Sequence, residues 1–159
     1  SPLLSGLVES LHALPELSEK LRQAIVAEPP AIIRDGGFVE SGFDPALDEL
    51  RAASLEGKGW IAALQEREIE RTGIKSLKVR FTSVFGYFIE ITKSNLPSVP
   101  ADYIRKQTTV NGERFVTPEL KEMEGKILGA DERARAREIE IFAELRAAAG
   151  THILDGATP

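Results

Sequence analysis

The sequence predicts an α+β fold in which two long antiparallel helices carry a small, mostly antiparallel β-sheet at their tip. Residues 73–116 alternate apolar and polar side chains with the two-residue period of half-buried strands. The segments on both sides place apolar residues at three- and four-residue spacing, which is typical of amphipathic helices. Because both long helices join the same small sheet, we expect them to run antiparallel.

The first 72 residues are predicted to be helical apart from one extended stretch. Leucines at helical spacing mark the first 27 residues, and Pro15 should split this helix in two because an interior proline removes a hydrogen-bond donor. Residues 31–39 are expected to form a short extended hairpin. Asp44 and Pro45 are typical of a helix start, as N-cap and first helical residue, and the helix should continue to about Thr72.

Residues 73–116 are expected to form about four strands, and residues 117–149 a returning helix. The pair Asn111-Gly112 is a strong signal for a two-residue hairpin turn, because both positions can take positive φ. A threonine-proline pair directly after the last strand repeats the helix-start signal. Residues 150–159 continue no pattern, so we expect a tail or an expression remnant there.

The two long helices are expected to pack against each other through apolar stripes. The predicted contacts are Leu47, Leu50, Ile61 and Leu64 against Met123, Ile127 and Leu145. Gly57 and Gly59 interrupt the first stripe, and each should weaken its helix by about 1 kcal/mol relative to alanine.

Charge is distributed unevenly along the chain. The whole sequence carries a formal net charge of −5, whereas residues 73–116 hold seven basic and three acidic side chains, a net +4. A basic segment in an acidic chain favours contact with a polyanion at this segment only. The alternative is a solvated sheet face whose lysines protect an edge from pairing.

Two short runs in this segment combine cations with hydroxyl and amide groups, the usual donors to phosphate oxygens. Arg105 and Lys106 should point to opposite faces of their strand unless a bulge intervenes. The segment lacks an exposed aromatic run for stacking single-stranded bases, so contact with a duplex backbone is the better fit. The predicted phosphate-binding residues are Lys93, Ser94, Asn95, Arg105, Lys106, Gln107, Thr109 and Arg114.

No catalytic residue, metal site or cofactor site is predicted for this chain. His12 and His152 lack metal-ligand spacing, the glycine pairs lack the phosphate-loop pattern, and cysteine is absent. No apolar run approaches the roughly 20 residues of a membrane span, and no signal peptide is recognisable. The opening serine in place of methionine leads us to expect an excised fragment.

Three runs of the chain carry a resemblance to a known family. They are AEPPAIIRDGGFVESGFDPALDELR, EREIERTGIKSLKVRFTSVFGYFIEITKSN and YIRKQTTVNGERFVTPELKEMEGKIL. Together they resemble the lever and clamp region of the bacterial DNA mismatch-repair MutS family, over about residues 14–145. The resemblance implies that the long helices are levers and that the sheet is a clamp, which contacts the phosphate backbone of double-stranded DNA without sequence specificity.

The resemblance also implies properties of a longer protein. The full-length proteins of this family use ATP and Mg and act with a second MutS subunit. They are cytoplasmic and nucleoid-associated, and no membrane is among their partners. Its ATPase domain is not matched here, so we expect no enzyme activity. Phe88-Ile89-Glu90 and Phe142-Ala143-Glu144 match its mismatch-reading Phe-x-Glu motif only as strings. The alternative function is a helical-hairpin scaffold of a MutS paralogue that binds protein or RNA.

Overall fold

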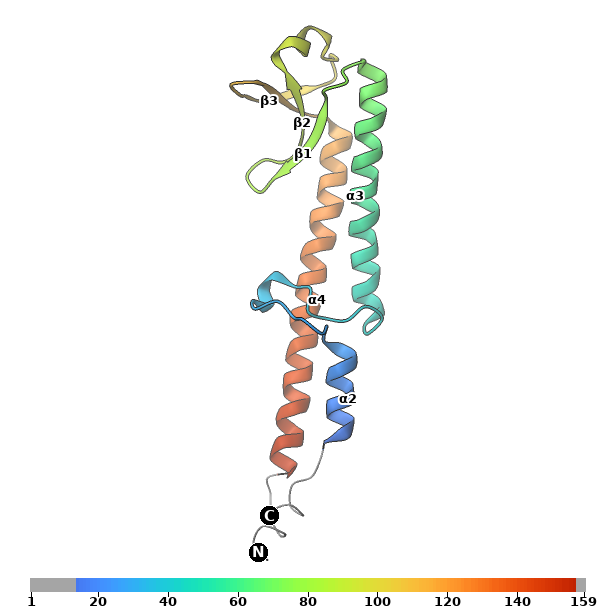
Figure 1. The fold of residues 1–159 in the computed structure, drawn as a ribbon, viewed down its shortest axis with the longest axis vertical. Helices are drawn as coiled ribbons and strands as arrows, with labels where there is room; N and C mark the ends of the chain where they lie inside the picture. The colour runs from blue at the N-terminus through green and yellow to red at the C-terminus, as the bar shows by residue number, and fades with distance from the viewer. Residues whose placement is uncertain (1–13, 157–159) are drawn as a thin grey trace, which may run out of the picture. The chain divides into compact units, whose positions relative to one another are not determined.

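The computed structural model describes residues 14–156, whose backbone forms helices and one four-stranded sheet (Figure 1). The α-helices are α2 (Pro15–Ala24), α3 (Pro45–Thr72) and α4 (Pro118–Gly156). The strands are β1 (Lys78–Thr82), β2 (Gly86–Thr92), β3 (Ile104–Thr108) and β4 (Gly112–Val116). The chain divides into two compact units: Glu49–Glu132, called the sheet unit below, and the described residues before and after it, called the terminal unit.

The sheet confirms the predicted α+β class with its antiparallel strands. Its strand order is β1-β2-β4-β3, so β1 and β3 are the two edges. A 3-10 helix that the sequence did not predict, η2 (Lys93–Ser98), connects β2 to β3. Because β4 returns between β2 and β3, side chains of β2 and of β4 that are distant in the sequence become direct neighbours.

The turn between β3 and β4 forms at the predicted place, but its backbone differs from the prediction. Neither Asn111 nor Gly112 has a positive φ, and the N–H of Thr109 donates to the carbonyl of Gly112 (2.8 Å). Gly112 is needed for another reason, because a Cβ at this position would collide with the carbonyl oxygen of Ile91 on β2. The glycine therefore permits two strands to approach closely.

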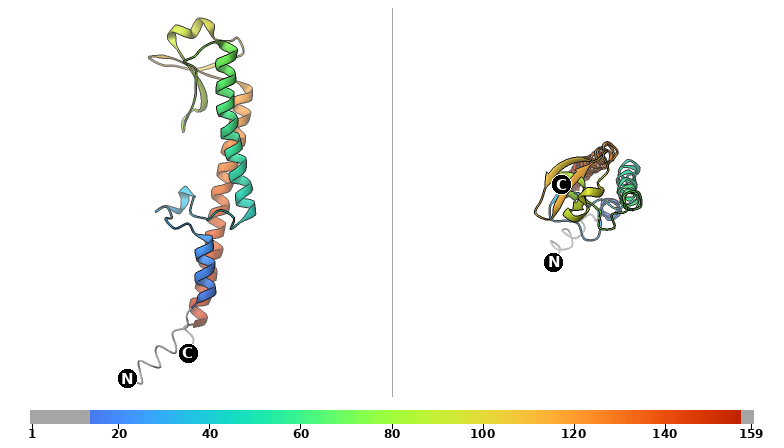
Figure 2. Two further views of the ribbon diagram at one scale, coloured as in Figure 1. Left: turned by 45° about the vertical axis from the view of Figure 1, so that its right-hand side comes forward. Right: turned by 90° about the horizontal axis from the view of Figure 1, so that it is seen from above.

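The core of the sheet unit lies between the sheet and the α3–α4 pair. Ile61 and Leu64 of α3 are buried in one cluster with Ile127 of α4, as the apolar stripes predicted. The sheet adds side chains from its inner face, among them Ile89 and Phe115. In Figures 1 and 2 the sheet lies beside the helix pair where α3 ends and α4 begins.

The remaining residues of the predicted stripe are divided between the two units. Met123 is partly buried against the core of the sheet unit, and Leu50 is half-buried. Leu47 and Leu145 are buried, but they belong to the terminal unit. The predicted stripe therefore contributes to two cores.

The two long helices approach each other closely at Gly57. A Cβ on Gly57 would collide with Cγ1 of Ile127, whereas a Cβ on Gly59 would meet no heavy atom within 4 Å. One turn away, the hydroxyl of Ser54 donates to Asp131 of α4 (2.5 Å). Gly57, which the sequence presented only as a weak point of the helix, is thus a contact between helices.

The terminal unit contains α2, which begins at Pro15 with the proline in its first turn. The helix predicted before Pro15 lies outside the described residues. The hairpin predicted over residues 31–39 is not formed: Val39 pairs with Ile25, and a 3-10 turn, η1 (Ile33–Asp35), precedes it. Two consecutive glycines with positive φ, 71° and 81°, follow that turn and redirect the chain.

Glu138 of α4 explains why Phe38 and Val39 leave the predicted hairpin. Its carboxylate is buried and accepts hydrogen bonds from the backbone N–H groups of Phe38 (3.0 Å) and Val39 (3.4 Å). The ring of Phe38 also packs edge-on against Phe142 of the same helix. A contact with α4 one hundred residues away therefore determines this segment.

Both long helices start as predicted. Asp44 accepts a hydrogen bond from the N–H of Leu47 (2.8 Å), and Thr117 accepts one from the N–H of Leu120 (3.1 Å). Asp44 also binds Arg137 (2.7 Å), and this hydrogen bond is the main cause that lowers the pKa of the Asp44 carboxyl.

Helix α4 differs from the prediction at its other end. It continues to Gly156 rather than ending near Ala149, so residues 150–156 are helical and not the expected tail. Gly150 does not adopt the left-handed backbone that ends helices, and the hydroxyl of Thr151 donates to the carbonyl of Ala147 (3.2 Å). None of the helices in the part that the structure describes is long and apolar enough to cross a membrane.

Candidate nucleic-acid interface

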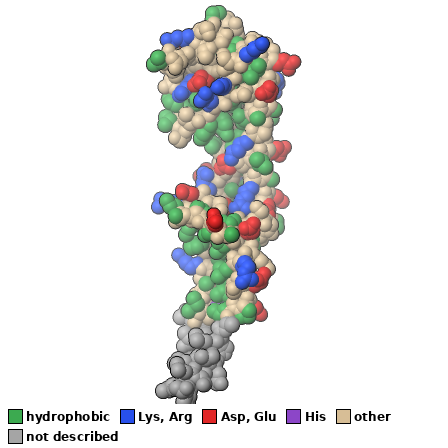
Figure 3. All heavy atoms as spheres, in the orientation of Figure 1, with side chains coloured by type: hydrophobic (Ala, Val, Ile, Leu, Met, Phe, Trp, Pro, Cys, Tyr) green, Lys and Arg blue, Asp and Glu red, His purple; other side chains and the backbone are tan. Residues whose placement is uncertain are grey.

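Most of the predicted phosphate-binding residues lie in two places on the sheet unit. One is the outer face of the sheet, opposite the core, and the other is the start of η2; Arg105 and Thr109 lie in neither. Strand register defines the outer face, because directly paired residues share a face: Arg80 pairs with Phe88, and Glu90 with Arg114. In Figure 3 the blue Lys and Arg side chains over the sheet lie next to red acidic ones and green hydrophobic ones.

A bulge in β3 decides which residues reach the outer face. Arg105 pairs with Phe115 and Gln107 pairs with Arg114, so Lys106 is an extra residue between them. Arg105 shares the face of the core residue Phe115 and binds Glu113 (3.5 Å). Lys106 and Gln107, although adjacent in sequence, both line a pocket on the outer face. The bulge thus brings Lys106 together with Gln107, and not with Arg105.

Arg114 is held in a defined position at the centre of the outer face. Its guanidinium lies over the ring of Phe88, 4.4 Å from the ring centre, and donates to the side-chain oxygen of Gln107 (2.9 Å). Glu90 lies between two arginines, 3.6 Å from Arg114 and 3.4 Å from Arg80. Because one carboxylate lies between two guanidinium groups, the row formed by Arg80, Glu90 and Arg114 has a net positive charge.

The second place is a cluster of small polar side chains at the start of η2. The amide of Asn95 donates to the hydroxyls of Ser76 and Thr92, both at 3.0 Å, and Ser94 lies 3.3 Å from Thr92. Both amide hydrogens of Asn95 are therefore used inside the cluster. The hydroxyl of Thr92 is also within hydrogen-bond distance of the hydroxyls of Ser76 (3.4 Å) and Ser94 (3.3 Å), and Lys93 adds a positive charge next to this cluster.

Thr109 has a structural contact of its own. Its hydroxyl donates to the carbonyl of Gly112 (3.1 Å) within the β3–β4 turn. The backbone N–H of Lys93 donates to the carbonyl of Asn111 in the same turn (3.1 Å), which ties η2 to the hairpin. The predicted contact of Thr109 with phosphate stays a prediction.

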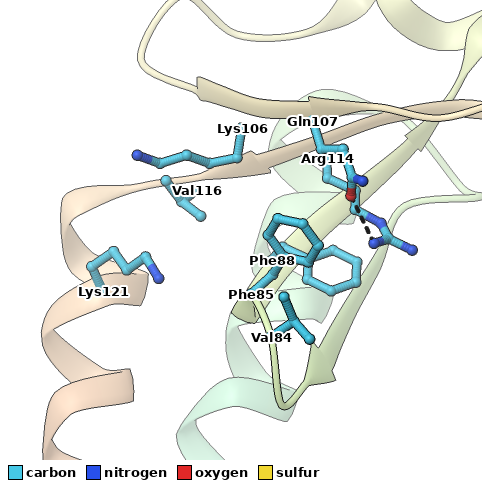
Figure 4. Close-up of a pocket in the computed structure, with 8 residues that line it drawn as sticks. All are labelled: Val84, Phe85, Phe88, Lys106, Gln107, Arg114, Val116 and Lys121. Atoms are coloured by element: carbon cyan, nitrogen blue, oxygen red, sulfur yellow. Dashed lines mark hydrogen bonds between the residues drawn. The ribbon is translucent and has the colours of Figure 1, made fainter.

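Sequence reasoning missed three residues beside these positions. Ser76 belongs to the η2 cluster, and Phe85 and Lys121 line the pocket on the outer face, which has a volume of about 260 Å³ (Figure 4). Phe85 lies in the β1–β2 turn and Lys121 in the first turn of α4. Only the folded arrangement brings them to the basic strand residues, so no local pattern could have identified them.

Two buried or nearly buried carboxylates, one on α3 and one on α4, connect these helices to the sheet and its flanking residues. Glu68 of α3 accepts a hydrogen bond from the hydroxyl of Tyr103 (2.6 Å) and binds Arg71 (2.7 Å), which also binds Asp102 (3.1 Å). Burial is the main cause that raises the pKa of the Tyr103 phenol, and the hydrogen bond from Arg71 lowers the pKa of Asp102. Glu124 of α4 accepts from the backbone N–H of Tyr87 on β2.

The described residues contain no group of three or more His, Asp or Glu side chains that could hold a metal ion. His12 lies outside the described range. The outer face of the sheet and η2 therefore offer cations, hydroxyl and amide groups, and a partly apolar pocket.

Known proteins are similar to this chain over a range that includes the sheet unit. The profile of MutS family domain IV matches residues 42–133, which include the whole sheet unit. A DNA mismatch repair protein MutS of Myxococcus xanthus (strain DK1622) is 58% identical over 147 residues, which cover 92% of this chain and 16% of that protein. A MutS protein of Methanosarcina acetivorans is 57% identical over 136 residues, 86% of this chain and 15% of that protein. The chain thus spans about a sixth of the length of these relatives.

Proposed function

Because this chain belongs to the MutS family of DNA mismatch-repair proteins, we propose that its sheet unit binds the phosphate backbone of duplex DNA without reading the base sequence. The observation that carries the proposal is the β3 bulge, which brings Lys106 and Gln107 to the face that holds Arg114. Lys93 and the neighbouring hydroxyls offer a second contact from η2. Phosphate contacts of this kind position a protein on DNA but carry no sequence information.

The two Phe-x-Glu strings support the absence of base reading. Phe88 and Ile89 are 2% and 0% exposed, so neither side chain is available to stack on a base. Phe142 packs against Phe38 in the terminal unit. We therefore assign mismatch recognition to neither string.

We expect weak binding that falls steeply with salt. Three neutralised phosphates correspond to a log–log slope of about −2.7, or roughly a forty-fold loss of affinity between about 50 and 200 mM salt. The dissociation constant should lie near 10⁻⁴ M or weaker, the non-specific range. The measurement is an NMR titration of this chain with matched and mismatched duplexes of equal length at both salt concentrations.

Two triple variants with the same change in charge make this test specific. Lys93→Ala, Lys106→Ala, Arg114→Ala, which removes the cations of the outer face and of η2, should abolish most of the binding. The control Lys20→Ala, Lys126→Ala, Arg146→Ala removes three exposed cations elsewhere and should leave binding nearly unchanged. A preference for the mismatch, or equal losses in both triple variants, contradicts backbone binding at these residues. Preference for an RNA duplex of equal length would instead support the RNA-binding scaffold.

For the whole protein we propose the partners and cofactors of its family: a second MutS subunit, and ATP with Mg outside the part of the relatives that this chain matches. A second subunit would strengthen DNA binding, because linked contacts act at high effective concentration. The location that fits this function is the cytoplasm, in association with the nucleoid.

We expect no ATP hydrolysis by this chain on its own, and no bound cofactor. The described residues offer neither a metal-binding group nor a phosphate loop. The measurement is phosphate release from ATP and Mg, with and without duplex DNA, by protein from two independent purifications. Hydrolysis that follows the protein through both purifications would show this prediction to be wrong.

A further inference from the structure

The pocket on the outer face combines an aromatic side chain with cations. Val84 and Phe85 of the β1–β2 turn lie beside Phe88, and Lys106 and Arg114 come from the other half of the sheet. Figure 4 shows Lys106 on one side of the two phenylalanine rings and Arg114 on the other. We propose that this pocket holds one unpaired nucleotide of a DNA strand next to the duplex, with its base against Phe85 and its flanking phosphates at the cations.

The size of the pocket fits one unit of a longer strand. Pockets that enclose drug-sized ligands start at about 300 Å³, and this pocket of about 260 Å³ lies just below that range. It therefore admits a single base or side chain whose polymer continues outside it. The proposal of a nucleotide pocket rests on the proposed function, because backbone contacts with the duplex would bring the strand to the pocket.

The ring of Phe85 is accessible, and hydrogen bonds hold the turn that carries it. It is 42% exposed, whereas Phe88 behind it is 2% exposed. The turn that carries Phe85 is held by a hydrogen bond from its own N–H to the hydroxyl of Thr82 (3.2 Å), and by the bond from Tyr87 to Glu124. A base can stack on such a ring whatever its identity, since every base has a π-face. Bases inside a duplex are already stacked, so the ligand must be unpaired.

The charges around the pocket favour a nucleic acid strand. No acidic residue is among those that line it. Lys121 is held by Glu124 (2.8 Å) and Arg114 by Gln107, but Lys106 makes no side-chain hydrogen bond or ion pair with any described residue. Its ammonium group is free to bind a phosphate of the incoming strand.

The test compares three DNA ligands that share one duplex. The first is blunt, the second carries a short single-stranded tail, and the third carries a tail of equal length without bases. We expect the tailed duplex to bind about ten-fold more tightly than the other two, the gain that stacking of one base provides. In a tail with 2-aminopurine, fluorescence should change on binding because the base stacks on Phe85.

A matched pair of variants tests the role of the ring. Phe85→Leu keeps an apolar side chain but removes the aromatic face, and should reduce binding of the tailed duplex about ten-fold to that of the blunt one. Phe81→Leu is the control, because Phe81 is 47% exposed on β1 and does not line the pocket. It should keep the preference for the tail.

Each result decides the proposal. If the tail without bases binds as tightly as the normal tail, or if Phe85→Leu and Phe81→Leu behave alike, the nucleotide pocket is refuted while duplex binding stands. If the chain binds the tail but not the blunt duplex, the pocket stands and the proposed duplex contact fails. Loss of the tail preference in Phe85→Leu alone supports the pocket.

Discussion

Replacing Ile127 by alanine should lower the free energy of unfolding by about 2–5 kcal/mol, the range for truncating a buried isoleucine. Ile127 is 1% exposed and lies where α3, α4 and the sheet meet. The cavity cannot close easily, because α3 already approaches α4 at Gly57 and the sheet is attached to both helices. Chemical denaturation followed by circular dichroism measures the loss.

Leu128→Ala is the matched control for this prediction. Leu128 is the next residue on α4 and is 40% exposed, so its truncation should cost no more than about 0.5 kcal/mol. A loss below about 0.5 kcal/mol for Ile127→Ala as well would mean that the two helices do not pack through this residue in solution.

Gly57→Ala should destabilise the chain by about 1–3 kcal/mol, as overpacking of a core does. The added methyl group would collide with Ile127, whose side chain is enclosed and has little room to move. Gly59→Ala is made in the same helix on its exposed side and should stabilise by up to about 1 kcal/mol, because alanine is the better helix former. Denaturation midpoints of the two variants should therefore shift in opposite directions.

A double variant separates the collision from a general effect on the helix. In Ile127→Ala the space that the methyl group needs is open, so adding Gly57→Ala there should cost much less than it does in the original chain. Strong non-additivity of this kind is expected for residues in contact. If Gly57→Ala costs the same in both backgrounds, the proposed collision is not its cause.

The features that the sequence predicted correctly depend on neighbours along the chain. Strand alternation in β2 and the caps at Asp44 and Thr117 involve residues within one or two turns of each other. Such signals need no knowledge of the rest of the fold, which is why the four strands and the starts of α3 and α4 could be placed from the sequence.

The features that it missed depend on contacts between distant segments. The segment at Phe38 is determined by Glu138, and the role of Gly57 by Ile127. The same holds for the candidate site: the predicted basic residues were found by composition, but their division between two faces follows from the pairing of β3 with β4. Phe85 reaches the pocket from the β1–β2 turn, and not from β3 or β4.

The bulge at Lys106 means that the number of residues in β3 can change without a change in the pairing of its neighbours. Because β3 is an edge strand, the extra residue disturbs no further neighbour, and Arg105 still pairs with Phe115 on the core side. Deleting that one residue would remove one cation from the outer face and leave the pairing on both sides intact. A deletion at this one position can therefore change the charge of the outer face while the core beneath it keeps its register.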